Sequence, residues 1–310
     1  MPSYHIEKSI VIDVPESQVR SAVGDFNEWP KWSPWLCMEP DARLNFVGTP
    51  LQVGHGYDWE GELVGSGKME IEKVGQNFEM DLEFFKPFKS KGNKVLMEIT
   101  PQSESSTKVT WHMDSKLPFF LFFMVDMMKT MIGMDYSRGL KMLKAYLETG
   151  SVNSHIEING VVDFAGCEFV GVQGQGKMEQ LGKEFESTLP QAHCLATDNN
   201  LEMIGGPGTL YDDTNLKTQE CVFTSLIPVK RSTELAGGVA GKLLPSKAVK
   251  VTHRGSYDFL GNGWSAAMSY QRSKKLKQLK KQSPFEFYLN DPDEVAESEI
   301  LTEIFIPIKG

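Results

Sequence analysis

The chain has 310 residues, of which 40% are hydrophobic and 24% are charged, and its formal net charge is −9. This composition is typical of a globular protein long enough for two domains, and it excludes a disordered or fibrous chain. The negative charge disfavours nucleic-acid binding, which needs a basic surface. The four cysteines are scattered and the six histidines show no paired metal spacing, so we expect free thiols, a cytoplasmic location, no metal site and no cofactor.

The first half begins with alternating apolar residues that predict a strand over 6–14, followed by a helix over 16–26. Residues 41–113 form short alternating runs broken by glycine or polar turns, which is typical of a meander of strands. A long helical pattern then extends from 117 to about 148. These elements predict an antiparallel sheet wrapped around one long helix.

Three of the six tryptophans, Trp29, Trp32 and Trp35, lie close together in the chain, with Pro30 and Pro34 between them. The two prolines fix the backbone and exclude a continuous helix. Such a cluster either closes the open end of a core or lines an aromatic pocket. We favour the first interpretation, because no polar group nearby suggests chemistry.

The run 117–129 is apolar enough to resemble a membrane span, but a span needs about 20 apolar residues. Asp126 and Lys129 interrupt this run, and leucines at helical spacing follow it. We therefore expect an amphipathic helix that covers the sheet, rather than stable membrane insertion. Its methionines would give an adaptable wall to any cavity beneath; they are Met124, Met127, Met128, Met131 and Met134.

The second half contains an internal repeat, in which Ser-Leu-Ile-Pro-Val-Lys at 225–230 recurs as Ile-Phe-Ile-Pro-Ile-Lys at 304–309. Each copy closes a series that predicts strand, helix, strand and strand. The predicted elements are 168–173, 177–189, 201–210 and 220–229 in the first copy, and 248–253, 259–281, 285–289 and 299–308 in the second. The basic run 272–281 then falls on the second helix, with its lysines facing water. Two such units related by a pseudo-twofold axis predict one sheet with both helices on one face, and a ligand groove along the axis.

The small polar segment 149–154 between the halves predicts a linker. We therefore expect two domains, 1–150 and 154–310.

The first half resembles the polyketide cyclase/START-like helix-grip superfamily (SRPBCC) over about residues 3–148. The resemblance implies a helix-grip fold, but it does not specify a reaction, because the superfamily includes ligand carriers and cyclases. It rests on the segments Ser-Ile-Val-Ile-Asp-Val-Pro at 9–15, 25–35 with the tryptophans, Tyr-Asp-Trp-Glu-Gly at 57–61, Phe-Phe-Lys-Pro-Phe at 84–88, Thr-Lys-Val-Thr-Trp at 107–111 and 139–144.

The second half resembles the GyrI-like (AraC-type effector-binding) domain over about residues 155–310. The resemblance implies a duplicated βαββ fold, which agrees with the repeat. It also implies binding of bulky, often cationic, apolar molecules by aromatic side chains and a buried glutamate; some stand-alone members are hydrolases of strained electrophiles. Its best signatures are His-Arg-Gly-Ser-Tyr at 253–257, Phe-Glu-Phe-Tyr-Leu-Asn-Asp-Pro at 285–292 and 301–308.

Candidate ligand-binding residues of the second half are two glutamates, each followed two positions later by an aromatic residue. Glu286 and Tyr288 share one face of a strand, and Glu303 and Phe305 share a face of the next. If both faces turn toward the pseudo-axis, these residues converge with Tyr257 and Trp264; the alternative is that the glutamates face water. Aromatic walls and a desolvated carboxylate suit a lipophilic cation. Glu286, Glu303 and Tyr257 are also the candidate catalytic residues, since a carboxylate can polarise water while a tyrosine donates a proton.

In the first half, Trp59, Phe84, Trp111 and Met113 lie on the strand meander, where they either line a cavity for an apolar ligand or pack the core. We therefore expect a small-molecule binding protein, a sensor or a sequestering protein for lipophilic compounds that include cations. It would have one cavity per domain and no DNA-binding module, because the two domains use both halves of the chain. The alternative is a hydrolase of reactive small molecules acting in the groove of the second domain. The sequence leaves the oligomeric state open.

Overall fold

The computed structural model describes residues 3–87 and 89–310. The chain divides into two compact units, Met1–Val152 and Asn153–Gly310. Each unit is built on one antiparallel sheet, with seven strands in the first and eight in the second. The fold is therefore α+β, as the sequence predicts.

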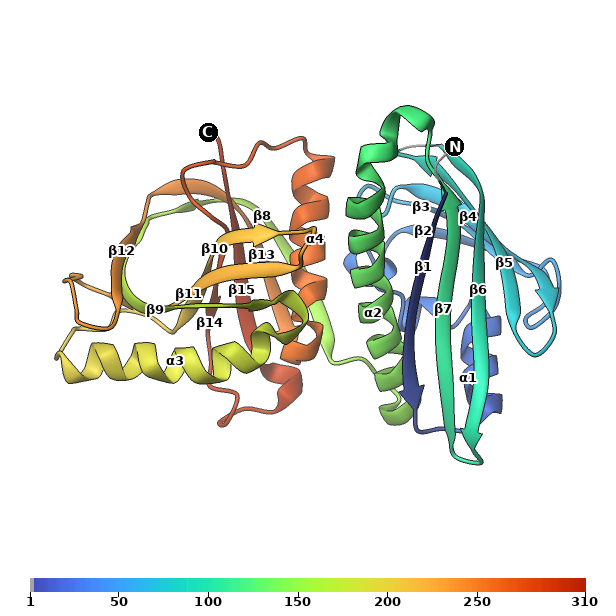
Figure 1. Ribbon diagram of the computed structural model, residues 1–310, viewed down its shortest axis with the longest axis horizontal. Coiled ribbons are helices and arrows are strands. Elements are labelled where there is room, and N and C mark those ends of the chain that lie inside the picture. The colour runs from blue at the N-terminus through green and yellow to red at the C-terminus, as the bar shows by residue number, and fades with distance from the viewer. Residues whose placement is uncertain (1–2, 88) are drawn as a thin grey trace. The chain divides into compact units, whose positions relative to one another are not determined.

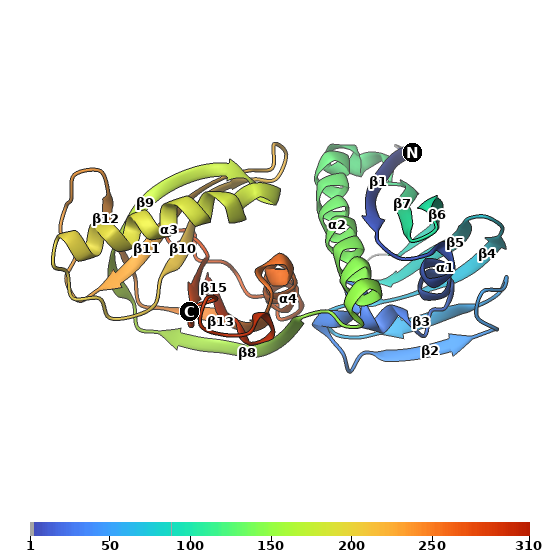
Figure 2. The same cartoon turned by 90° about the horizontal axis from the view of Figure 1, so that it is seen from below.

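The sheet of the first unit has the strand order β1-β7-β6-β5-β4-β3-β2, so that only β1 leaves the order of the chain. The long helix α2 packs mainly on β1, and Figure 2 shows α2 along the open side of the curved sheet. The elements are β1 (Ser3–Ile12), α1 (Glu16–Gly24), η1 (Trp29–Lys31), η2 (Leu36–Met38), β2 (Arg43–Val47), β3 (Gly56–Glu60), β4 (Ser66–Val74), β5 (Phe78–Lys86), β6 (Ser90–Ser103), β7 (Ser106–Lys116), η3 (Phe119–Met124) and α2 (Val125–Thr149).

The start of the long helix differs from the prediction. Pro118 precedes a 3₁₀ segment, η3, and the α-helix begins only at Val125. The fully buried positions of α2 begin at Gly133, so the expected methionine wall is only half-buried, and Met134 is exposed. In the described part of the chain, no helix is long and apolar enough to cross a membrane. Four phenylalanines of η3 face solvent instead of the sheet; they are Phe119, Phe120, Phe122 and Phe123.

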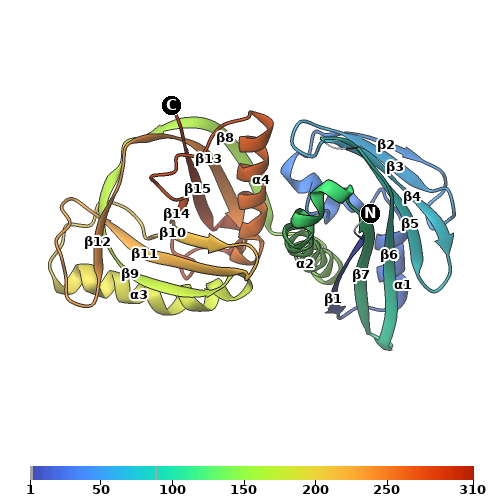
Figure 3. The same cartoon turned by 45° about the horizontal axis from the view of Figure 1, so that its top comes forward.

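The sheet of the second unit has the order β12-β9-β11-β10-β14-β15-β13-β8. Figure 1 and Figure 3 show its two helices, α3 and α4, beside different strands. Helix α3 packs on β9 and β11, and α4 packs on β13, β8 and β15. The elements are β8 (Ser154–Phe164), β9 (Cys167–Lys177), η4 (Met178–Gln180), α3 (Leu181–Asp198), β10 (Gly208–Asn215), β11 (Glu220–Val229), β12 (Val239–Leu243), β13 (Ser246–Gly255), η5 (Tyr257–Phe259), α4 (Leu260–Ser273), β14 (Phe285–Tyr288), η6 (Glu297–Glu299) and β15 (Leu301–Ile308).

The sheet shows the predicted duplication. The order β9-β11-β10 of the first copy is mirrored by β14-β15-β13 of the second, so a pseudo-twofold axis passes between β10 and β14. In the register of these two strands Gly208 pairs with Phe287 and Leu210 pairs with Phe285, which places the axis between Thr209 and Glu286.

Three predicted elements of this unit are wrong in extent. The helix predicted over 177–189 spans Leu181–Asp198 and continues through Pro190. The strand predicted over 201–210 begins only at Gly208, because Gly205, Gly206 and Pro207 interrupt the chain before it. The helix predicted to reach residue 281 ends at Ser273, and Lys275 has a left-handed φ of 54°. Most of the basic run therefore lies after the helix instead of on it.

The face of the sheet opposite the helices carries an aromatic core. Phe285 is fully buried and stacks on Phe305, with ring centroids 5.1 Å apart and the ring planes 13° from parallel. Phe164 of β8 packs against both rings, with its centroid 4.8 Å from that of Phe285. Phe169 of β9 and aliphatic residues from β11, β12 and β13 complete this cluster. Alternate residues of β14 thus fix the strand in the core and leave the others facing α3 and α4.

Candidate functional site

A carboxylate lies at the pseudo-twofold axis. Glu286 is the second residue of β14, between Phe285 and Phe287 of the aromatic core, so its side chain points to the helix-covered face. It is 0% exposed. In residues 3–87 and 89–310, no cation contributes to its electrostatics. A buried carboxylate without a counter-ion is costly unless hydrogen bonds compensate it.

Three aromatic side chains donate hydrogen bonds to this carboxylate. The Oη atoms of Tyr288 and Tyr211 lie 2.7 and 3.0 Å from Oε1 of Glu286. The indole Nε1 of Trp264 lies 2.7 Å from Oε2. Oγ1 of Thr209 lies 2.9 Å from Oη of Tyr288 and donates to it, because the tyrosine proton is used for Glu286. Three donors thus bind the carboxylate directly, and the fourth, Thr209, binds one of these donors.

The site perturbs the pKa of its members. Burial raises the pKa of Glu286, and the hydrogen bonds from Tyr288, Trp264 and Tyr211 oppose this rise. Burial and the nearby Glu286 carboxylate raise the pKa of Tyr211 and that of Tyr288 well above the ordinary value. Both phenols therefore keep their protons and remain hydrogen-bond donors to the carboxyl group of Glu286.

The donors follow the internal duplication. Thr209 and Glu286 are paired across the axis, so Tyr211 and Tyr288, each two residues further along, occupy equivalent positions. Both reach the same oxygen of Glu286. The equivalence breaks at the axis, where one copy has threonine and the other glutamate. The duplication thus builds a site with a single negative charge between two tyrosines.

Tyr257 lies at the outer edge of the site. Its ring packs edge-on against that of Tyr288, with centroids 5.6 Å apart, and it is 38% exposed. Burial, and after it the charge of Glu286, raises the pKa of Tyr257 to about 12. Gly255 makes the turn that presents this ring: its φ is +130°, and a Cβ there would clash with the backbone oxygen of Asn153. The glycine of the His-Arg-Gly-Ser-Tyr signature is thus required by the backbone.

The predicted convergence of the second glutamate is wrong. Glu303 is paired with Phe287, and Phe305 with Phe285, so both lie on the aromatic-core side of the sheet, opposite to Glu286. Glu303 is instead 2.7 Å from Nζ of Lys250 in an ion pair. The residues that do share the face of Glu286 and Tyr288 are Ile304 and Thr302.

Tyr211 was absent from the predicted site. The strand predicted over 201–210 ended before Tyr211. A register shift between Leu210 and Asp213 also interrupts the alternation of buried and exposed residues along β10. Its ring also packs edge-on against Trp264, with centroids 5.0 Å apart. The signal that identifies it is the repeat, because Thr209-Leu210-Tyr211 aligns with Glu286-Phe287-Tyr288.

The four candidate residues of the first unit are found in its packed interior. The rings of Trp59 and Phe84 are neighbours, with centroids 6.0 Å apart, at one end of the sheet. Trp111 and Met113 are both buried further along the same face, on β7. Trp111 stacks on Tyr136 of α2 at 4.2 Å. The structure brings them to one face but not to one spot, and a role in ligand binding stays a prediction.

The tryptophan cluster forms part of this packing. Trp29 and Trp32 are fully buried, with ring centroids 4.5 Å apart, and both make edge contacts with Trp111. The indole of Trp29 donates to the carbonyl of Val23 at 3.0 Å. Trp35 is half-buried, and its indole donates to Oδ2 of Asp135, 3.1 Å away on α2. The cluster thus closes the interior between the sheet and α2.

Comparison with known families identifies the two units. Residues 3–148 match the family described as polyketide cyclase / dehydrase and lipid transport, and residues 161–309 match the GyrI-like small molecule binding domain. The chain is therefore a fusion of an SRPBCC-type domain with a GyrI-like domain, and the resemblances of the two halves to these families are confirmed. Both are families of small-molecule binding domains. No curated protein matches the chain.

Solved structures resemble parts of the chain at low sequence identity. The regulator EcmrR, solved in a complex with DNA, is 17% identical with a TM-score of 0.43, covering 61% of this chain and 67% of its own. SAV2435, solved bound to tetraphenylphosphonium, is 17% identical with a TM-score of 0.38, covering 50% and 94%. A START superfamily protein from Mycobacterium smegmatis is 17% identical with a TM-score of 0.35, covering 47% and 99%.

Proposed function

We propose that the GyrI-like domain binds a lipophilic organic cation at Glu286, and that the protein acts as a sensor or a sequestering protein for such compounds. The single observation that carries this proposal is the fully buried carboxylate, which three aromatic donors hold and which no cation among the described residues neutralises. A ligand cation would supply the missing charge, and its attraction to the carboxylate is strong in a desolvated site.

The surroundings of Glu286 suit an apolar cation better than a metal ion or an amine with many hydrogen bonds. The rings of Tyr211, Tyr288, Tyr257 and Trp264 surround the carboxylate, and aromatic faces attract organic cations. Tyr211 and Trp264 are half-buried and Tyr257 is exposed, so three of the four rings around Glu286 are partly accessible to solvent. Rotation of these rings would admit the ligand.

The hydrogen bonds favour binding over hydrolysis. In a hydrolase, a tyrosine hydroxyl would donate to the leaving atom of the substrate. Here the hydroxyls of Tyr211 and Tyr288 both donate to Glu286. The same tyrosines therefore hold the carboxylate in place, which is a binding role.

Titration calorimetry with tetraphenylphosphonium as the probe tests the proposal. Glu286→Gln keeps the size of the side chain and removes its charge, so we expect affinity to fall by about 10- to 100-fold, the loss of one charge-assisted contact. Glu303→Gln is the matched control, because it removes a carboxylate from the opposite face of the sheet. Equal affinity of the wild type and Glu286→Gln would overturn the proposal.

A further inference from the structure

The outer face of the first sheet carries a group of titratable side chains that belongs to a different unit from the Glu286 site. In the register of β1 and β7, His5 is paired with Asp114, and Glu7 is paired with His112. The neighbours Tyr4 and Ile6 are buried, so these four residues lie together on the opposite, solvent-facing side. The pairing places the two imidazoles on one diagonal of the group, with ring centroids 5.6 Å apart.

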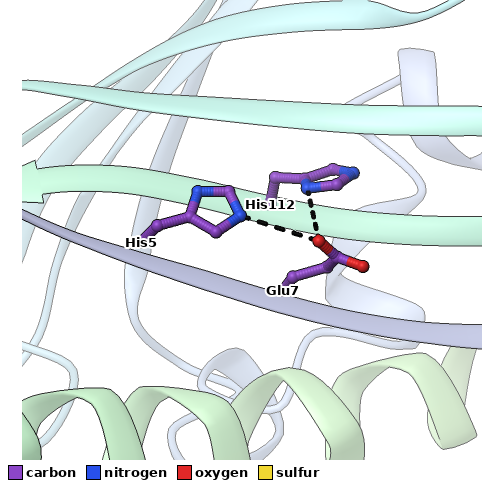
Figure 4. A group of neighbouring side chains, drawn as sticks. All are labelled: His5, Glu7 and His112. Carbon is purple, nitrogen blue, oxygen red and sulfur yellow. Dashed lines mark ion pairs between the residues drawn. The ribbon is translucent and has the colours of Figure 1, made fainter.

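One nitrogen of each imidazole is directed at the same carboxylate oxygen. Nε2 of His5 and Nδ1 of His112 both lie 3.7 Å from Oε2 of Glu7, as Figure 4 shows. One ligand atom from each of the three side chains lies within 4.8 Å of the others. Zn–N and Zn–O bonds of about 2.1 Å in a tetrahedral site require ligand atoms about 3.4 Å apart. Small rotations of the exposed His5 and Glu7 side chains bring the three atoms to that spacing.

The second nitrogen of each imidazole is held by another carboxylate. Nδ1 of His5 lies 2.9 Å from Oδ1 of Asp114, and Nε2 of His112 lies 3.1 Å from Oε2 of Glu98 on β6. In a neutral imidazole these bonded nitrogens carry the proton, so the lone pairs of the other two face Glu7. A lone pair and a carboxylate oxygen cannot form a hydrogen bond with each other, whereas both can bind one cation. Carboxylates that orient histidines in this way are typical of metal sites.

We propose that His5, Glu7 and His112 form a zinc site on the outer face of the first sheet. Two imidazole nitrogens and one carboxylate oxygen are ligands that Zn²⁺ prefers, whereas Mg²⁺ and Ca²⁺ prefer oxygen alone. Three protein ligands leave a fourth position for water or for a donor from a partner, and the exposed setting of His5 and Glu7 keeps that position accessible. The ion also neutralises part of the charge of Glu7, Asp114 and Glu98.

Titration of chelator-treated full-length protein with Zn²⁺ in a calorimeter tests this site. We expect one ion per chain, with affinity lowered at least tenfold in His5→Ala and in His112→Ala, and about tenfold in Asp114→Asn, which removes only the orienting carboxylate. His193→Ala is the matched control, because His193 is an exposed histidine on α3, and we expect it to bind Zn²⁺ like the wild type.

Co²⁺ provides a second readout that does not depend on stability. We expect a visible absorption spectrum of a four-coordinate ion in the wild type and in His193→Ala, and none in His112→Ala that circular dichroism shows to be folded. The proposal is overturned if the wild type takes up no Zn²⁺, or if His5→Ala and His112→Ala bind it as tightly as the wild type does.

Discussion

The hydroxyl of Tyr288 offers a quantitative test of how the protein holds its buried carboxylate. Tyr288→Phe removes the 2.7 Å hydrogen bond to Glu286 and leaves the ring in place. A hydrogen bond to a charged group contributes about 1.5–3 kcal/mol, and one pKa unit corresponds to about 1.4 kcal/mol. The pKa of Glu286 should therefore be higher in Tyr288→Phe than in the wild type, by about one to two pH units.

The direction of the pH dependence follows from the same argument. A cation needs the ionised carboxylate, so its affinity is constant above the raised pKa of Glu286 and falls about tenfold per pH unit below it. The midpoint pH of tetraphenylphosphonium binding should move up by about one to two units in Tyr288→Phe. Tyr257→Phe is the control: it also removes a tyrosine hydroxyl beside Tyr288, but that hydroxyl is not one of the three donors to Glu286, so the midpoint should not move. An unchanged midpoint in Tyr288→Phe would refute the reasoning.

Three further substitutions test the packing of the two domains and the turn that presents Tyr257. Phe285→Ala removes a fully buried ring from the aromatic core and should lower the free energy of unfolding by about 3–5 kcal/mol, measured by urea denaturation; a loss below about 1 kcal/mol would contradict its place in the core. Gly139→Ala places a Cβ 3.0 Å from Pro34 and from the Trp111 ring. It should destabilise the first domain by about 1–3 kcal/mol, although alanine favours helices. A raised melting temperature would show instead that Pro34 and Trp111 move to accommodate the methyl group. In Gly255→Ala, the alanine would have to adopt a positive φ, and its Cβ would clash with Asn153. The variant should therefore have a lower melting temperature, and it should bind tetraphenylphosphonium more weakly because Tyr257 is displaced. Wild-type values of both would show that this turn is not constrained.

The sequence predicted the elements that depend on local pattern and on the repeat. The alternation along β14 placed Glu286 and Tyr288 on one face, and the hydrogen bond between them confirms it. The duplicated β-α-β-β order could be predicted because the segments 225–230 and 304–309 resemble each other. The end of the second helix could not be predicted in this way. The leucines and lysines after Ser273 continue a helical pattern, but Lys275 adopts a left-handed conformation that breaks the helix.

Features that depend on pairing between strands could not be predicted in this way. Glu303 has the same spacing to Phe305 as Glu286 has to Tyr288, but a register that pairs Glu303 with Phe287 places it on the opposite face. A shift of one residue inverts every side chain of a strand, and the sequence pattern does not specify that shift when both faces are apolar. The His5 and His112 group was missed for the same reason, since only the register of β1 and β7 brings the two histidines together.

The central claim is that Glu286 selects a positive charge, and two probes of one shape test it most directly. Tetraphenylphosphonium and tetraphenylborate are alike in size and aromatic surface and differ in the sign of their charge. Calorimetry on the wild-type chain at a pH above the midpoint of the cation titration should show binding of the phosphonium and at least tenfold weaker binding of the borate, because the buried carboxylate attracts the first and repels the second. Equal affinity for the two ions, or tighter binding of the borate, would contradict the account.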